Sequence, residues 1–107
     1  MGASKLEIHS ENINTIATMA KVLAHPARVA ILKYISEQQD CICNDIVSKV
    51  GLSQPTISQH LKVINEAGLL EGQFKGNSLK YCLNKQRFEQ LRELLNSFLD
   101  QTQSNCC

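Results

Sequence analysis

The sequence predicts a mainly α-helical domain that carries one small β hairpin. Apolar residues recur at helical spacing through most of the 107 residues, whereas residues 70–83 alternate as in a strand pair. Aromatic residues make up only 5% of the chain and Trp is absent, which disfavours a large all-β sandwich. A chain of this length, 43% hydrophobic, can build one compact core. We therefore expect a single domain over residues 1–107, with flexible ends at 1–10 and 102–107.

Two helices are expected in the first third of the chain. The apolar residues over 11–23 fall on one helical face, and His25-Pro26 then interrupts the pattern. Pro26 suits the first turn of a second helix, which fades in the polar run 37–40. The first apolar stripe contains Ile13, Ile16, Ala17, Ala20 and Leu23, and the second contains Ala27, Ile31, Leu32 and Ile35.

A short helix, a glycine and a longer helix follow in the middle of the chain. The short helix is expected over about 45–50, because Gly51 is a good left-handed helix stop. Ser53 suits the N-cap of the longer helix over about 54–67, and Pro55 is tolerated in its first turn. A short helix, a tight turn and a second helix form the pattern of a DNA-binding helix-turn-helix.

A hairpin and a final helix complete the predicted fold. Residues 70–74 and 79–83 are the expected strands, joined by the glycine-containing loop 75–78. The last helix is expected over about 85–101, with Phe88, Leu91, Leu95, Phe98 and Leu99 on its apolar stripe. Including a short strand at Cys41-Ile42-Cys43, the order is α-α-(short β)-α-α-β-β-α, which is that of a winged helix.

The outward face of the second helix of this motif carries the candidate DNA contacts. If Ile57, Leu61 and Ile64 face the core, the opposite face holds mostly uncharged hydrogen-bonding side chains. Gln can pair bidentately with adenine, and Ser or Thr can reach bases or phosphates. A polar surface helix without a partner is the alternative, and His60 suits a structural role equally well. The candidates are Ser53, Gln54, Thr56, Ser58, Gln59, His60, Lys62 and Lys75.

The charge distribution is compatible with a nucleic-acid surface but does not require one. The net charge is +1, yet residues 49–80 carry four Lys against two Glu. No apolar run approaches the roughly 20 residues of a membrane helix, and the N-terminus has no hydrophobic secretion segment. We therefore expect a cytoplasmic protein with no membrane partner.

Two runs of sequence resemble signatures of the ArsR/SmtB repressors. Residues 23–32 are similar to that family's L-x-[HD]-P-x-R-x-x-I-L pattern, and residues 52–61 resemble its recognition helix. Gly68-Leu69-Leu70 with Lys75-Gly76 resembles the entry to its wing, so that the resemblance covers roughly residues 13–100. The resemblance implies a homodimer through the first and last helices. It also implies a repressor that binds an imperfect palindrome in double-stranded DNA without a cofactor, and that an inducer releases.

Cys41 and Cys43 are the candidate sensor. In an extended segment, cysteines at i and i+2 point to the same side and can chelate one ion. A nearby helix N-terminus favours thiolate, and thiolates select thiophilic ions. Metalloid-sensing members of the resembled family carry Cys-Val-Cys at this place, although a third cysteine found in some of them is Ile46 here. Two buried cysteines acting as small hydrophobes are the alternative.

The remaining cysteines could complete such a site. An odd count of five, without a secretion signal, indicates free thiols, metal ligands or redox sensors rather than a disulfide framework. Cys106 and Cys107 lie on the predicted tail and could fold back or cross to a partner subunit, or they could be an inert chain end. Cys82 lies on the outer side of the second strand and is at most an auxiliary ligand.

The leading hypothesis is a repressor released when As(III), or Sb(III), Cd(II) or Pb(II), binds these thiolates. A second hypothesis keeps the repressor, but two thiols form a disulfide or polysulfide under oxidant or reactive sulfur. A third is a thiol oxidoreductase, which the lack of a C-x-x-C motif disfavours, or a zinc-structured interaction module held by Cys41, Cys43, Cys106 and Cys107. A zinc site on the last helix is not expected because that helix has no His. No enzyme is expected, since the chain shows no Ser/His/Asp set, phosphate loop or carboxylate pair.

Overall fold

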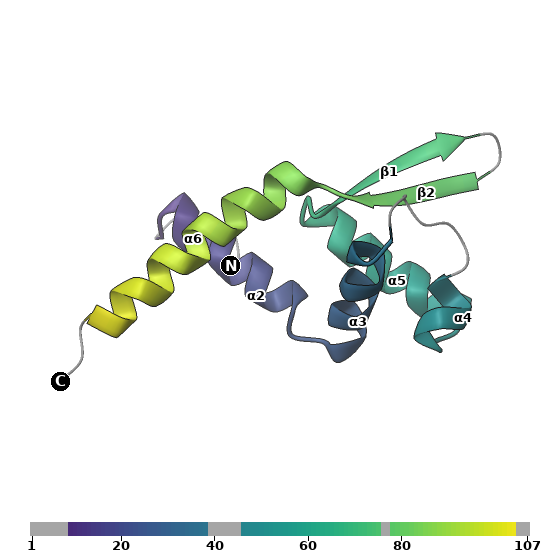
Figure 1. The fold of residues 1–107 in the computed structure, drawn as a ribbon, viewed down its shortest axis with the longest axis horizontal. Coiled ribbons are helices and arrows are strands. Elements are labelled where there is room, and N and C mark those ends of the chain that lie inside the picture. The colour runs from purple at the N-terminus through teal and green to yellow at the C-terminus, as the bar shows by residue number, and fades with distance from the viewer. Residues whose placement is uncertain (1–8, 39–45, 76–77, 105–107) are drawn as a thin grey trace.

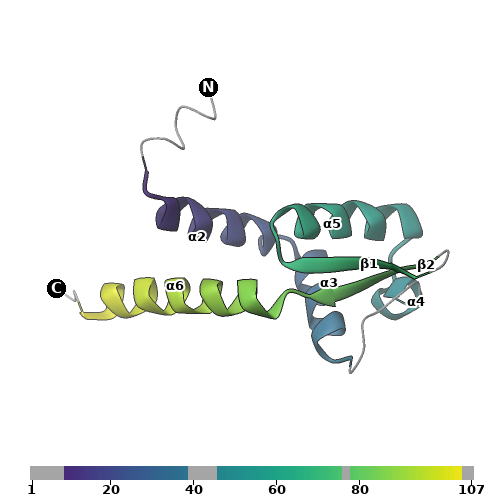
Figure 2. The same ribbon diagram turned by 90° about the horizontal axis from the view of Figure 1, so that it is seen from above.

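The computed structural model describes residues 9–38, 46–75 and 78–104, and its elements follow the predicted order (Figure 1). The helix-turn-helix and the hairpin gather at one end of the molecule. Helices α2 and α6 run antiparallel at the other end, where they pack against each other (Figure 2). The elements are α2 (Glu11–Val22), α3 (Pro26–Ser36), α4 (Ile46–Val50), α5 (Gln54–Glu66), β1 (Leu70–Lys75), β2 (Ser78–Leu83) and α6 (Lys85–Ser104).

One hydrophobic core holds the helix-turn-helix against α3 and the hairpin. The three residues of α5 that the sequence predicts to face inward are all buried. Ile57 and Ile64 are 0% exposed, and Leu61 is 4% exposed. These residues pack with side chains from α2, α3, α4, the start of β1 and α6, so the face of α5 opposite them is left to solvent. The other members of the core are Val22, Ile31, Leu32, Ile35, Ile46, Leu69, Leu70 and Leu91.

Glycines end both helices of the helix-turn-helix, as the sequence predicts. Gly51 after α4 has φ +83° and Gly68 after α5 has φ +82°, a conformation in which a Cβ atom is strained. Ser53 occupies the N-cap of α5 in an extended conformation. Its hydroxyl, however, lies 3.0 Å from the hydroxyl of Thr56 and does not accept a bond from a backbone amide.

The hairpin leads directly into α6 through one asparagine. Its strands pair antiparallel from Leu70 opposite Leu83 to Lys75 opposite Ser78, one residue longer at the tip than predicted. The backbone nitrogen of Asn84 donates to the Leu69 carbonyl at 2.9 Å, and the side-chain nitrogen Nδ2 of Asn84 donates to the Gly68 carbonyl at 3.1 Å. The Asn84 side-chain oxygen also accepts from the Arg87 backbone at 3.2 Å. Asn84 therefore caps α6 and ties its start to the chain that leaves α5.

A helix or its cap extends into each of the two end segments that the sequence predicts to be flexible. Helix α6 continues through residues 102–104 because this stretch has no Gly or Pro, and the Thr102 hydroxyl bonds to the Leu99 carbonyl at 2.7 Å. Ser10 is the N-cap of α2, and its hydroxyl accepts from the Ile13 amide at 3.3 Å. The strand predicted at Cys41-Ile42-Cys43 lies outside the described residues, as do the rest of the two ends.

Truncation of Ile64 tests the core beneath α5. We expect Ile64→Ala to lower the free energy of unfolding by about 2–5 kcal/mol, because the side chain is fully buried and leaves a cavity. Ile64→Val, which removes one methylene, should cost about 0.5–1.5 kcal/mol. Urea titration followed by circular dichroism measures both values. Equal effects of the two variants would contradict close packing at this position.

Candidate nucleic-acid interface

The outward face of α5 is an exposed row of hydrogen-bonding side chains. It lies opposite the buried Ile57, Leu61 and Ile64, as the periodicity predicts. The face carries amides and hydroxyls at its N-terminal end and one cation further along, without any carboxylate before Glu66. Its exposed residues are Ser53, Gln54, Thr56, Ser58, Gln59 and Lys62.

These polar groups pair with one another only weakly and at the surface. The side-chain amide of Gln54 donates to the Ser58 hydroxyl at 3.1 Å, and the Ser53 and Thr56 hydroxyls share a contact of 3.0 Å. Both pairs are exposed, so exchanging them for contacts with a partner leaves no buried polar group unsatisfied. The face is therefore chemically able to read base edges without disturbing the core.

His60 differs from the other candidates because it is half-buried and already bonded. The Arg28 side chain donates from Nε to Nδ1 of His60 at 3.3 Å, which joins α3 to α5. The His25 ring lies 5.9 Å from the His60 ring, centroid to centroid. Burial lowers the pKa of His60, and the nearby Arg28 and His25 lower it further. Arg28 is not among the candidate site residues that the sequence predicts. The one signal that could have identified it is its position as the arginine of the L-x-[HD]-P-x-R-x-x-I-L pattern.

The two predicted lysine contacts are placed by different elements. Lys62 is exposed on α5, on the same side of the motif as the amide row. Lys75 ends β1, opposite Ser78 at the tip of the described hairpin. Strand β1 packs against α5, so the hairpin lies directly beside the helix-turn-helix (Figure 1).

The candidate thiol site is only partly within the described residues. Cys82 lies half-buried on β2, opposite Glu71, and is disulfide-bonded. The sequence does not predict this bond, because pairing between distant cysteines has no local sequence signal. The other four cysteines lie outside the described residues. Among the residues described, no three His, Cys, Asp or Glu side chains converge on a possible metal position.

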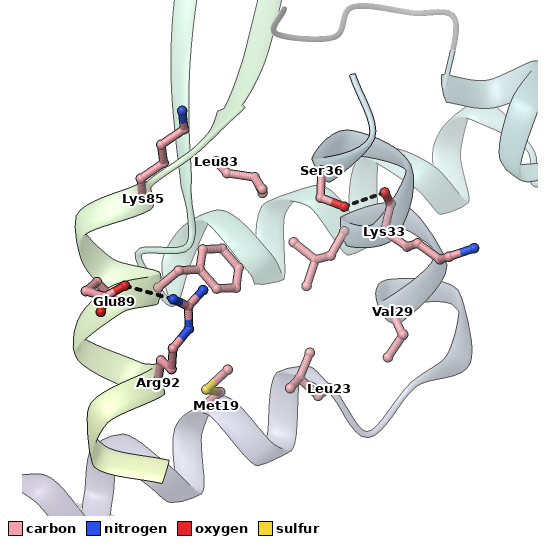
Figure 3. Close-up of a pocket in the computed structure, with 11 residues that line it drawn as sticks. Met19, Leu23, Val29, Lys33, Ser36, Leu83, Lys85, Glu89 and Arg92 are labelled. Atoms are coloured by element: carbon pink, nitrogen blue, oxygen red, sulfur yellow. Dashed lines mark hydrogen bonds and ion pairs between the residues drawn. The ribbon is translucent and has the colours of Figure 1, made fainter. Parts of the chain in front are cut away.

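Apolar surface is exposed along α2 and α6. A groove of 670 Å³ opens between α2, α3, the end of β2 and α6, with Met19, Leu23 and Val29 among its apolar walls (Figure 3). The Arg92–Glu89 ion pair of 3.1 Å lies along its α6 side. A second hollow of 180 Å³ lies between α2 and α6. Ile13, Phe98 and Leu99 are 53%, 47% and 51% exposed, respectively.

Within the described ranges, no helix combines the length and hydrophobicity that crossing a lipid bilayer needs. The longest helix, α6, has 20 residues, but polar and charged side chains interrupt it throughout.

The arrangement of α4, α5 and the adjoining hairpin defines a winged helix-turn-helix domain. The family model "Bacterial regulatory protein, arsR family" matches residues 25–71, which run from the start of α3 into β1. The arsenical resistance operon repressor of Staphylococcus xylosus is 30% identical over 92 residues, which are 86% of this chain and 88% of that relative. The chain belongs to the ArsR family, whose members are DNA-binding transcriptional regulators and not enzymes.

Other relatives and solved structures agree with this assignment. The SmtB transcriptional repressor of Mycobacterium tuberculosis is 33% identical over 68% of this chain, and the match spans about half (53%) of that relative's length. The crystal structure of a possible transcriptional regulator for arsenical resistance superposes with a TM-score of 0.63 at 31% identity, covering 81% of this chain and 94% of that one. The repressor BigR from Xylella fastidiosa gives 0.62 at 25% identity, covering 92% and 97%.

Proposed function

We propose that this chain is a dimeric repressor that binds double-stranded operator DNA through α5. The exposed amide and hydroxyl face of α5, held over a fully buried apolar face, is the observation that carries this proposal. An α-helix fits the major groove, where Gln, Ser and Thr can read base edges. Lys62 and Lys75 are suited to phosphates on either side, because Lys neutralises the backbone without reading sequence.

Dimerisation through α2 and α6 would give the operator its symmetry. The apolar side chains Ile13, Phe98 and Leu99 are each about half exposed in the single chain, and the two hollows that α2 and α6 line are mostly apolar. A second copy related by a two-fold axis would cover this surface with the same surface of its own. Two α5 helices would then face half-sites about one DNA turn apart, on an imperfect palindrome. In this proposal the DNA complex forms without a cofactor, in the cytoplasm.

The proposed inducer is a thiophilic ion, with As(III) first and Sb(III), Cd(II) or Pb(II) as further candidates. Cys41 and Cys43 precede Ile46, the first residue of α4, by five and three positions. Three thiolates suit As(III), so we propose that Cys106 or Cys107 supplies the third sulfur. The arsenical resistance repressor among the relatives supports an arsenic inducer over other thiophilic ions.

Binding of the inducer at Cys41 and Cys43 would act on α5, the helix proposed to read the DNA, through the adjoining helix α4. Helix α4 has only five residues and is joined to α5 by the turn at Gly51. Sulfur ligation just before α4 would therefore bias the helix-turn-helix toward an orientation that fits the two half-sites poorly. The inducer and the operator would then bind with negative coupling, each weakening the other by the same factor.

Replacing one thiol tests the inducer. We expect arsenite to release wild-type protein from a fluorescent duplex taken from upstream of its own gene, as measured by anisotropy. Cys43→Ser should bind the duplex with wild-type affinity but lose the arsenite response, because one ligand is gone. In a buffer whose reductant opens the disulfide of Cys82, Cys82→Ser is the matched control and should keep that response. Arsenite release that persists unchanged in Cys43→Ser would contradict the assigned site.

The disulfide at Cys82 favours a second candidate function, thiol-based redox sensing. Two thiols and one peroxide would give one disulfide and two waters, so the sulfurs are oxidised and the peroxide is reduced. In that case peroxide would release the operator in metal-free buffer, and Cys82→Ser would abolish the response. An arsenite response that is lost in Cys43→Ser, together with no peroxide response, would exclude this candidate. No described feature favours the zinc-structured module.

A further inference from the structure

Arg28 joins three helices through one guanidinium group. Its Nε donates to Nδ1 of His60 on α5 at 3.3 Å, and its Nη1 donates to the carbonyl of Lys21 at the end of α2, also at 3.3 Å. Arg28 itself lies in the first turn of α3. A single half-buried side chain therefore bridges a helix of the proposed dimer surface and the proposed reading helix.

The bond to His60 requires a neutral imidazole. Arginine is always a donor, so Nδ1 of His60 must offer its lone pair, and the ring proton then resides on Nε2. Protonation would place a hydrogen on Nδ1, which removes the acceptor and sets a cation against Arg28. The lowered pKa of His60, caused first by burial and then by Arg28 and His25, agrees with a neutral ring at neutral pH.

We propose that Arg28 and His60 are positioning residues that hold α5 in register with α2, so that specific operator binding depends on a neutral His60. The inference rests on the proposed function, because it assigns to these residues the placement of the helix that reads the DNA. In this role Arg28 need not touch the DNA. Its two hydrogen bonds provide a continuous physical connection from the α2–α6 pair to α5.

A double-mutant cycle tests the connection. Arg28→Ala and His60→Ala should each lower the ratio of operator affinity to scrambled-duplex affinity about tenfold, a typical coupling for bonded residues. If the residues act through each other, the double variant should be no weaker than the weaker single variant. Arg87→Ala is the control, since it also removes one guanidinium, and that guanidinium bonds to Gln90 on its own helix. Singles at the wild-type ratio, or effects that multiply in the double variant, would overturn the proposal.

A pH profile gives a readout that a merely structural role would not move. The wild-type affinity ratio should fall as pH decreases from 7.5 to 5.5, because His60 gains a proton and loses Arg28. His60→Asn keeps an acceptor near the position of Nδ1 but cannot titrate, so it should hold the wild-type ratio at pH 7.5 and stay flat. Protonation at low pH makes the protein more positive and strengthens its binding to any DNA. The ratio of operator affinity to scrambled-duplex affinity cancels this general effect. Parallel profiles of the two proteins, or a flat wild-type profile, would overturn the proposal even if the alanine variants fold poorly.

The charged or titratable groups that face His60 among the described residues are Arg28 in the first turn of α3 and His25, the N-cap residue before it. His25 is present in both proteins, so the difference between their profiles reports His60 alone. The free energy of unfolding should change in the same direction as the affinity ratio, and both should fall as the pH decreases. The unfolded chain binds more protons than the folded one between the ordinary pKa of about 6.5 and the lowered value. The contribution of His60 to stability is thus complete above pH 6.5 and is lost as pH falls through that window.

Failure of this inference is distinguishable from failure of the proposed function. If variants of Gln54 and Gln59 bind the operator as the wild type does, α5 is not the reading helix and the proposed function fails first. If those variants lose affinity while Arg28→Ala does not, α5 reads the DNA but Arg28 does not position it. The two sets of proteins therefore give separate answers.

Discussion

Replacing Gln54 and Gln59 together with Ala is expected to abolish sequence-specific operator binding while leaving the fold unchanged. Each amide is exposed on the outward face of α5, and the Gln54 amide donates to the exposed Ser58 hydroxyl. A good bidentate contact to a base contributes about 1–3 kcal/mol of discrimination. The dimer loses two such contacts per subunit, four in all, so operator affinity should fall by roughly several hundredfold or more, toward the affinity for scrambled DNA.

Two further variants distinguish base reading from charge. Asn65→Ala, exposed on the last turn of the same helix, is the matched control and should bind as the wild type does. Lys62→Ala should weaken binding to operator and to scrambled duplex alike, and should reduce the salt slope by about 0.9 per subunit, or about 1.8 for the dimer. Anisotropy titrations at several salt concentrations measure all three variants. A Gln54→Ala/Gln59→Ala protein that still discriminates the operator would contradict the role given to α5.

Placing a carboxylate at Phe98 is expected to separate the dimer and, with it, to remove tight operator binding. Phe98 is 47% exposed on the apolar stripe of α6, beside Leu99 at 51%. In an interface with two-fold symmetry, one substitution counts twice, because each subunit contributes the residue to the same contact. Lost apolar burial and a buried charge together should weaken association by about 3 kcal/mol or more, roughly a hundredfold or greater.

Sedimentation velocity over a concentration series measures the association of Phe98→Glu. Ser97→Glu adds the same charge at an exposed position of α6 outside the apolar stripe and should remain dimeric. Circular dichroism should show wild-type helix content for both, since Phe98 lies outside the buried core of the single chain. Phe98→Glu that sediments as a dimer would show that subunits meet elsewhere.

The arrangement of α5 was predictable from sequence because its constraints are local. A helix whose apolar residues recur at 57, 61 and 64 has one possible buried side, and the structure buries those three residues fully or nearly so. Gly51 and Gly68 marked both helix ends for an equally local reason, the left-handed backbone conformation that glycine adopts without strain. Asn84 could also have been identified, because asparagine directly before a helix is a common N-cap.

Other features depend on contacts between distant parts of the chain and carry no comparable signal. Arg28 and His60 are 32 positions apart, so their hydrogen bond depends on how α3 crosses α5. The disulfide of Cys82 likewise depends on the approach of another segment. The sequence predicts that α6 ends near residue 101, whereas the helix continues to Ser104. Residues 102–104 are polar and resemble a tail, but none of them breaks a helix that is already formed.

Photocrosslinking at position 59 tests the central claim, that α5 reads the operator, most directly. Benzoylphenylalanine would replace Gln59 on the outward face of α5 or, in the control, Glu93, which is exposed on α6. With a radiolabelled operator duplex, we predict a crosslink from position 59 that unlabelled operator competes away more effectively than scrambled DNA, and none from position 93. Crosslinking from position 93 with none from position 59 would contradict the account.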